Sequence, residues 1–95
     1  MNLKFVEFDW DEYNEPKIWN KHRVTADEVE DCFFNIHVLK KKPGSSDRYY
    51  LYGKTNGGRC LFIVFQYVKD IEFIRPISAR DMNSGEFSVY GRNLK

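Results

Sequence analysis

The sequence is short of cysteine, of excess charge and of long hydrophobic runs. Its two cysteines, Cys32 and Cys60, show neither a CxxC motif nor a Cys/His spacing typical of zinc sites, so we expect free, buried thiols and no metal or other cofactor. No apolar stretch approaches the ~18 residues of a membrane span. The charged first dozen residues lack the apolar core of a secretory signal. We therefore expect a cytoplasmic protein that makes no membrane contact.

Positive and negative side chains nearly cancel, at a formal net charge of +1. Such a chain does not attract nucleic acid through an overall positive potential, so any anion site must come from local clusters of Lys and Arg. Among the 95 residues 17% are aromatic, well above what a disordered segment carries. The length suits one hydrophobic core, which predicts a single domain over residues 1–95.

Capping patterns predict a helical hairpin in the first third of the chain. Asn14 is expected to cap a helix that runs to about His22. Thr25 and Glu28 form a capping box that starts a second helix. That helix is expected to end at Asn35 in a left-handed conformation.

The second half of the chain is typical of strands. Three segments rich in Tyr, Phe, Ile and Val predict strands: 48–54, 59–68 and 71–78. Asn56–Gly57 favours a type I′ hairpin turn and Lys69–Asp70 a second turn, so the three strands should form an antiparallel meander. Alternation over residues 3–8 predicts a short first strand. Pro76 cannot donate to a ladder, which predicts an edge position or a β-bulge.

Two segments carry weaker patterns. Residues 35–47 are expected to form a loop, in which the lysine run 40–42 has the ordinary interpretation of a solvated edge. The tail after Asp81 predicts only a weak, short helix, since it holds Asn83 and Gly85.

The stretch from Ile74 to Met82 is the best candidate for an anion site. It places two arginines and a serine where a strand meets its exit loop, and a forked guanidinium suits a phosphate. Taken alone, Arg75 and Arg80 have the more ordinary interpretation of an edge-strand residue and a solvated loop charge, which the sequence favours until the rest of the chain is considered. Arg75 should also face opposite to Ser78, unless Pro76 introduces a bulge.

Metal-free RNA cleavage needs groups that move protons and fixed cations that stabilise the phosphate as charge develops. His22 is the natural proton carrier, with Lys21 beside it. An equally weighted alternative is that His22 is a helix C-terminal cation facing the dipole. The candidate catalytic residues are His22, Lys21, Arg59, Ser78 and Arg80. The candidate substrate-binding residues are Arg75, Glu72 and Tyr52.

The aromatic side chains of the predicted sheet support a competing interpretation. Tyrosines and phenylalanines on adjacent strands could stack single-stranded bases, as in sheet-based RNA-binding modules. The more ordinary interpretation assigns most of them to the core. The set is Tyr49, Tyr50, Tyr52, Phe62, Phe65 and Tyr67.

Taken in order, the motifs resemble those of the BrnT toxins, ribonucleases of type II toxin–antitoxin pairs. The resemblance covers residues 8 to about 90 and is carried by Trp10–Asp11, Lys21–His22, Arg48–Tyr49, Arg59 and the Ile-Ser-Ala-Arg run 77–80. It implies a RelE-like α+β fold, with an N-terminal strand and a two-helix hairpin packed on an antiparallel meander and a short C-terminal helical segment. It also implies a metal-independent endoribonuclease that cleaves mRNA and arrests translation.

The same resemblance implies partners. These are an RNA substrate and a BrnA-like antitoxin with a ribbon-helix-helix DNA-binding part. Operator DNA would be contacted only through that antitoxin. The assembly could be a homodimer or a heterotetramer, and both alternatives stay open. The sequence departs from the family in two places. Arg23 stands where glycine commonly follows Lys-His, and Ser84 and Gly85 weaken the charged terminal helix. A non-catalytic homologue, or a module that binds RNA or antitoxin, is therefore the alternative.

Overall fold

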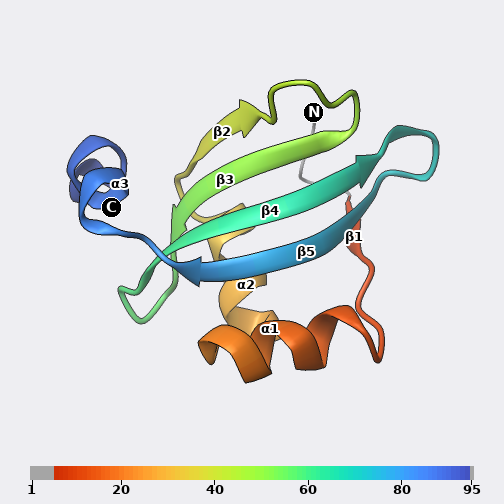
Figure 1. Ribbon diagram of the computed structural model, residues 1–95, viewed down its shortest axis with the longest axis horizontal. Coiled ribbons are helices and arrows are strands. Elements are labelled where there is room, and N and C mark those ends of the chain that lie inside the picture. The colour runs from red at the N-terminus through yellow and green to blue at the C-terminus, as the bar shows by residue number, and fades with distance from the viewer. Residues whose placement is uncertain (1–5, 95) are drawn as a thin grey trace.

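The computed structural model describes residues 6–94 of the protein. Its elements, in chain order, are β1 (Glu7–Phe8), α1 (Asn14–His22), α2 (Ala26–Phe34), β2 (Val38–Lys41), β3 (Arg48–Lys54), β4 (Cys60–Val68), the 3₁₀ turn η2 (Lys69–Ile71), β5 (Phe73–Asp81), α3 (Ser84–Val89) and the 3₁₀ turn η3 (Gly91–Asn93). The strands form one mixed sheet in the order β1-β5-β4-β3-β2 (Figure 1). Strands β2 to β5 are antiparallel neighbours, and β1 pairs in parallel with β5.

The predicted helical hairpin is confirmed, although its caps differ in detail. The Thr25–Glu28 capping box is present at the start of α2. Asn14 is the first residue of α1 and not its cap; the Asp11 carboxylate accepts the backbone N–H of Asn14 instead. Asn35 ends α2 in an extended conformation, so the predicted left-handed stop is wrong. The left-handed residue of the hairpin is Arg23, at φ 55°, where glycine would be free of strain.

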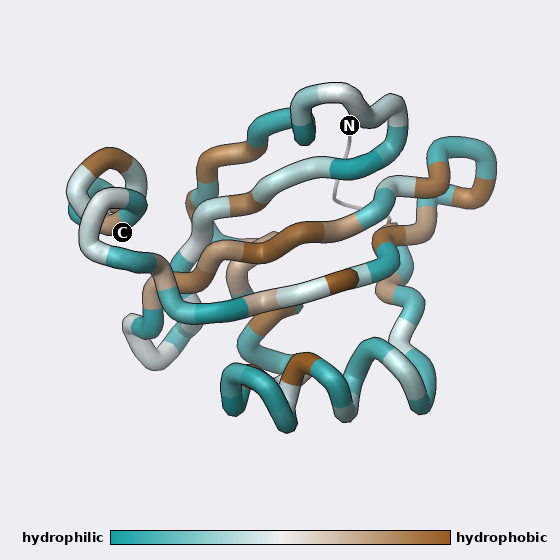
Figure 2. Tube along the Cα trace, in the orientation of Figure 1, coloured by the Kyte–Doolittle hydropathy of each residue, from teal (hydrophilic) through white to brown (hydrophobic). Residues whose placement is uncertain are grey.

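Both helices cover the same face of the sheet. Helix α2 packs on β3 and β4, and α1 lies along β5. The hydrophobic core lies between the two helices and the sheet. Helix α1 contributes Ile18 to it, and its other members include Val29, Cys32, Phe33, Leu51, Leu61, Ile63, Phe65 and Ile74. Figure 2 shows the most hydrophobic stretch of the sheet along β4 and a largely hydrophilic α1. The opposite face, here called the open face, is half-buried, and the C-terminal segment packs over one end of it.

The cysteines are free, as predicted, but only one is fully buried. Cys32 lies in the core, where burial raises the pKa of its thiol to about 12, while Cys60 is half-buried. None of the helices in the described part of the chain has both the length and the apolar character that crossing a bilayer requires.

The sheet corrects two predictions and tests a third only in part. The segment 35–47 is not all loop, because Val38–Lys41 forms β2 against β3. The predicted first strand is seen only as Glu7–Phe8, and residues 3–5 lie outside the described part. The β3–β4 turn is not type I′, because its positive φ falls on Gly58, at 92°, and the Gly58 N–H donates to the Thr55 carbonyl.

A β-bulge in β5 decides which of its side chains share a face. Phe65 pairs with Pro76 and Val64 with Ser78, so Ile77 is an extra residue. Pro76 is buried on the core side before the bulge and Ala79 after it. Side-chain parity therefore reverses, and Arg75, Ser78 and Arg80 all lie on the open face. The bulge predicted from Pro76 is confirmed.

Gly53 of β3 provides a test of the packing between α2 and the sheet. An added Cβ would lie 2.7 Å from the Cys32 Cβ and 2.9 Å from a Leu51 methyl. We expect Gly53→Ala to lower the free energy of unfolding by about 1–3 kcal/mol, through overpacking. Gly57→Ala is the matched control, because its Cβ would meet only Thr55, at 3.8 Å. Urea denaturation measures both, and equal stability of the two variants would contradict this packing.

Candidate active site

The last turns of α1 meet the bulge of β5 around a small cavity of about 100 Å³, here called the α1–β5 cavity. It is lined by Lys17, Ile18, Lys21, His22, Ile77 and Ser78. Three predicted site residues, Lys21, His22 and Ser78, are thus brought together from positions far apart in the sequence. Lys17 joins them because residues four apart share a helix face. That spacing makes Lys17 recognisable in the sequence, although Lys17 is not among the candidate site residues predicted from it.

His22 sits beside a carboxylate at the exposed C-terminal end of α1. The pKa of Asp81 is held below its usual range, chiefly by hydrogen bonds from Arg59 and, to a smaller extent, by the charge of His22. The backbone carbonyl of His22 accepts Arg59 Nη2 at 3.0 Å, which fixes the helix end against the sheet. The exposed imidazole can therefore meet a substrate while its backbone is anchored.

Arg80 lies two residues beyond Ser78 on the open face, about 7 Å along the strand. Its guanidinium makes a forked pair with Glu86 of α3, at 2.8 and 2.9 Å. It also lies over the Phe62 ring, 4.5 Å from the centroid. Arg80 is thereby held in one orientation, with its charge already paired by a carboxylate.

Tyr52 lies under the C-terminal segment near Arg80. Its ring stacks on Tyr90 with centroids 3.9 Å apart, and burial raises its pKa. Lys40 Nζ lies 5.3 Å from the Tyr90 centroid. The structure therefore gives Tyr52 a packing partner within the protein and leaves 8% of it exposed.

Arg59 joins the sheet to the helical hairpin through a set of hydrogen bonds and ion pairs, here called the Arg59 staple. It donates to both Asp81 oxygens, at 2.7 and 3.0 Å, and to the carbonyl of Arg23 at 2.8 Å. It also pairs with Glu28 at 3.2 Å. With these partners Arg59 holds the left-handed exit of α1 in place.

Arg75 and Glu72 lie toward the other end of β5. Arg75 pairs with Asp9 at 3.1 Å and with Asp11 at 2.8 Å. Its hydrogen bond is the largest cause of the lowered pKa of Asp11, about 2. Glu72 precedes β5 and is six positions from Ser78, roughly 20 Å along the strand. The structure does not bring Glu72 to the α1–β5 cavity.

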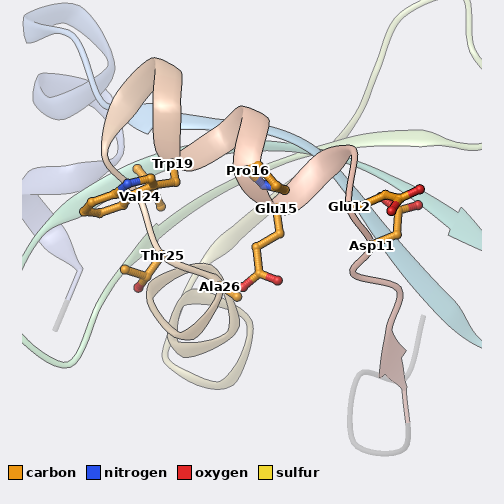
Figure 3. A pocket seen from close by; sticks show the side chains of 8 residues that line it. All are labelled: Asp11, Glu12, Glu15, Pro16, Trp19, Val24, Thr25 and Ala26. Carbon is orange, nitrogen blue, oxygen red and sulfur yellow. The ribbon is translucent and has the colours of Figure 1, made fainter.

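A larger pocket lies on the other flank of α1, facing α2. It has a volume of about 430 Å³ and is lined by Trp19, Pro16 and the carboxylates Asp11, Glu12 and Glu15. Figure 3 shows Glu15 reaching from α1 toward the start of α2. Carboxylates repel phosphate, so this pocket is unsuited to RNA, and the cationic flank of α1 is the better candidate.

Comparison with known proteins identifies a family. A family model described as "Ribonuclease toxin, BrnT, of type II toxin-antitoxin system" matches residues 10–86, a range that includes α1, the bulge and Arg80. The 1.1 Å crystal structure of the Brucella abortus ribonuclease toxin BrnT is similar, with a TM-score of 0.62 and 25% sequence identity. That match covers 83% of this chain and 99% of the other. No curated protein matches the chain.

The staple formed by Arg59 predicts a loss of stability that depends on pH. We expect Arg59→Ala to lower the free energy of unfolding at pH 7 by about 1–3 kcal/mol, because several charge-assisted hydrogen bonds are lost. The folded-state pKa of Asp81 is depressed, so its contribution is present above the ordinary value of 3.8 and disappears as pH falls below it. The difference in the free energy of unfolding between wild type and Arg59→Ala should therefore become smaller in acid.

Chemical denaturation at neutral and acidic pH measures this gap. Arg92→Ala, which changes an exposed arginine in η3, is the control and should match wild type. A loss at pH 7 no larger than that of the control would contradict the staple.

Proposed function

The chain belongs to the BrnT family of ribonuclease toxins of type II toxin–antitoxin systems, and on this premise we propose that it cleaves mRNA and arrests translation. The observation that carries the proposal is the convergence of Lys17, Lys21, His22 and Ser78 on one cavity, with Arg80 two residues beyond Ser78 on β5. A general base, cations and a hydroxyl donor stand together there. These are the groups that cleavage by the neighbouring 2′-hydroxyl requires.

The proposed reaction assigns one role to each group. Neutral His22 takes the proton of the 2′-hydroxyl, whose oxygen attacks phosphorus. The Lys21 ammonium protonates the leaving 5′-oxygen, and the Ser78 hydroxyl donates to a non-bridging oxygen. The products are a 2′,3′-cyclic phosphate and a 5′-hydroxyl end. Histidine suits the first step because its charge changes near neutral pH.

Arg80 is proposed to stabilise the phosphate as negative charge builds on it. Its forked pair with Glu86 has the geometry in which arginine also binds phosphate oxygens. A substrate phosphate would exchange with the carboxylate on a guanidinium that Phe62 already orients. Ser78 and Arg80 share one face, so a single phosphate can approach both side chains.

Family membership implies an antitoxin partner. We propose that it is BrnA-like and that its ribbon-helix-helix part alone contacts operator DNA. We also propose a cytoplasmic location and a RelE-like relationship for the α+β fold. Homodimer and heterotetramer remain alternatives for the assembly.

A non-catalytic toxin homologue is the second candidate function. The observation favouring it is that Arg59, Arg75 and Arg80 all have carboxylate partners within the protein. In such a homologue these arginines would support the fold and the antitoxin surface without contacting RNA. Activity measurements decide between the two.

Induced expression in a bacterial host tests the assigned roles. Wild type should arrest growth, and His22→Ala should relieve the arrest, with a loss of about 100-fold or more in the cleavage rate of purified protein. His37→Ala is the matched control, because His37 lies after α2, outside the α1–β5 cavity, and its Nδ1 contacts the Asn35 carbonyl at 2.8 Å. Equal toxicity of wild type and His22→Ala would remove His22 from the mechanism. RNA binding by wild type without cleavage would favour the second candidate.

The chemistry of the products gives a separate test. No group of three or more His, Cys, Asp or Glu within residues 6–94 is arranged to hold a metal ion. We therefore expect cleavage of a short RNA to continue in excess EDTA and to leave 2′,3′-cyclic phosphate ends, detected by mass spectrometry. Products bearing 5′-phosphate ends, or activity lost in EDTA and restored by Mg²⁺, would contradict the proposed reaction.

A further inference from the structure

A second cavity adjoins the first on the same flank of α1. This cavity, here called the Arg48 cavity, has a volume of about 240 Å³. Its lining includes Tyr13, Lys17, Arg48, Gln66, Arg75 and Ile77. Lys17 and Ile77 line both cavities, so the two lie side by side along the seam between α1 and β5 and are together called the groove. The groove runs from His22 and Ser78 at one end to Arg48 and Gln66 at the other.

The cations of the Arg48 cavity fall into two kinds. Arg75 is held by Asp9 and Asp11. Lys17 and Arg48 are exposed and make no ion pair with any residue in the described part of the chain. Two charges are thus available to an anion at this end of the groove.

The acidic residues around this cavity are already engaged. Asp9 and Asp11 pair with Arg75, and Asp47 accepts Gln66 Nε2 at 2.8 Å and the Ser45 hydroxyl at 3.1 Å. The hydrogen bond from Gln66 is the main cause of a lowered pKa for Asp47. The same bond orients the Gln66 amide at the cavity wall.

We propose that the Arg48 cavity holds the nucleotide next to the scissile phosphate of a single-stranded RNA, an inference that rests on the proposed function. Lys17 and Arg48 bind the phosphate of that nucleotide. Tyr13, which is 73% exposed at the rim, offers a face on which its base stacks. The cavity is smaller than the ~300–1,000 Å³ of typical small-molecule sites. It therefore fits part of one extended nucleotide.

The aromatic side chains of the open face are less suited to this role. The Tyr50 and Phe62 rings pack together with centroids 5.2 Å apart, and Tyr52 packs on Phe62 at 5.1 Å while Tyr90 covers it. Their faces are used within the protein. Tyr13 has no such neighbour among the aromatic pairs of the described residues, and it borders the unpaired cations.

Binding of a 2′-O-methyl hexanucleotide tests the subsite without cleavage, because the blocked 2′-oxygen cannot attack. Fluorescence anisotropy over a salt series should show about tenfold weaker binding for Arg48→Ala and a log–log salt slope smaller by about 0.7, the value for one lost phosphate contact on a single strand. Arg48→Lys should keep the wild-type slope. Arg92→Ala, outside the groove, should bind like wild type.

Cleavage of substrates of two lengths separates this proposal from the proposed function. Wild type should prefer a hexanucleotide to a dinucleotide in kcat/KM, and Arg48→Ala should reduce that preference about tenfold, through KM. If wild type cleaves RNA but shows the same length preference and the same salt slope as Arg48→Ala, the subsite would be overturned and the ribonuclease would stand. Wild type that binds RNA through Arg48 but does not cleave it would support the subsite and overturn the ribonuclease. Wild type that neither binds nor cleaves RNA would overturn both.

Discussion

The β-bulge at Ile77 is the constraint on which the arrangement of the site depends. Without the extra residue, Arg75 would face the opposite side of β5 from Ser78 and Arg80. The bulge is fixed from outside the sheet, because the buried Asn14 side chain donates to the Pro76 carbonyl at 3.0 Å and to the Asp9 carbonyl at 2.8 Å. One amide therefore ties the start of α1 to the bulge of β5. The groove between α1 and β5 exists because these two settings are coupled.

Ion pairing explains how a chain of net charge +1 can present a cationic groove. Arg59, Arg75 and Arg80 are each matched by carboxylates close to the sheet. Pairing cancels their charge at a distance. Among residues 6–94 it leaves Lys17 and Arg48 without an ion pair beside one flank of α1, while the other flank carries a carboxylate-lined pocket. The electrostatic character of the surface thus differs across a single helix. Net charge, which averages both flanks, could not reveal this difference.

Much of the fold was predictable because its determinants are local. The Thr25–Glu28 capping box and the first two strands of the meander were confirmed, and Pro76 correctly pointed to a bulge. The third strand was predicted over residues 71–78, but it starts two residues later and ends three residues later, as Phe73–Asp81. β2 was missed because its four residues end in lysines, and only pairing with β3 makes them a strand. For the site, the structure places Lys21, His22 and Ser78 around one cavity, and their catalytic roles stay predictions. The partners of Arg59 could not be foreseen, since they lie 22 to 37 residues away and include backbone carbonyls exposed by a left-handed turn.

The pairing of Arg80 with Glu86 bears on how a substrate could reach the guanidinium. Glu86 Oε1 also accepts the backbone N–H of Asn83 at 2.9 Å, so the same carboxylate closes the capping box of α3. Loss of Arg80 to a phosphate would therefore leave Glu86 anchored at the start of its helix, and the stack of Tyr52 on Tyr90 would still hold the C-terminal segment. Exchange of one anion for another at Arg80 requires only a local movement. A paired arginine is for this reason compatible with a phosphate site, since the carboxylate keeps the guanidinium oriented until substrate replaces it.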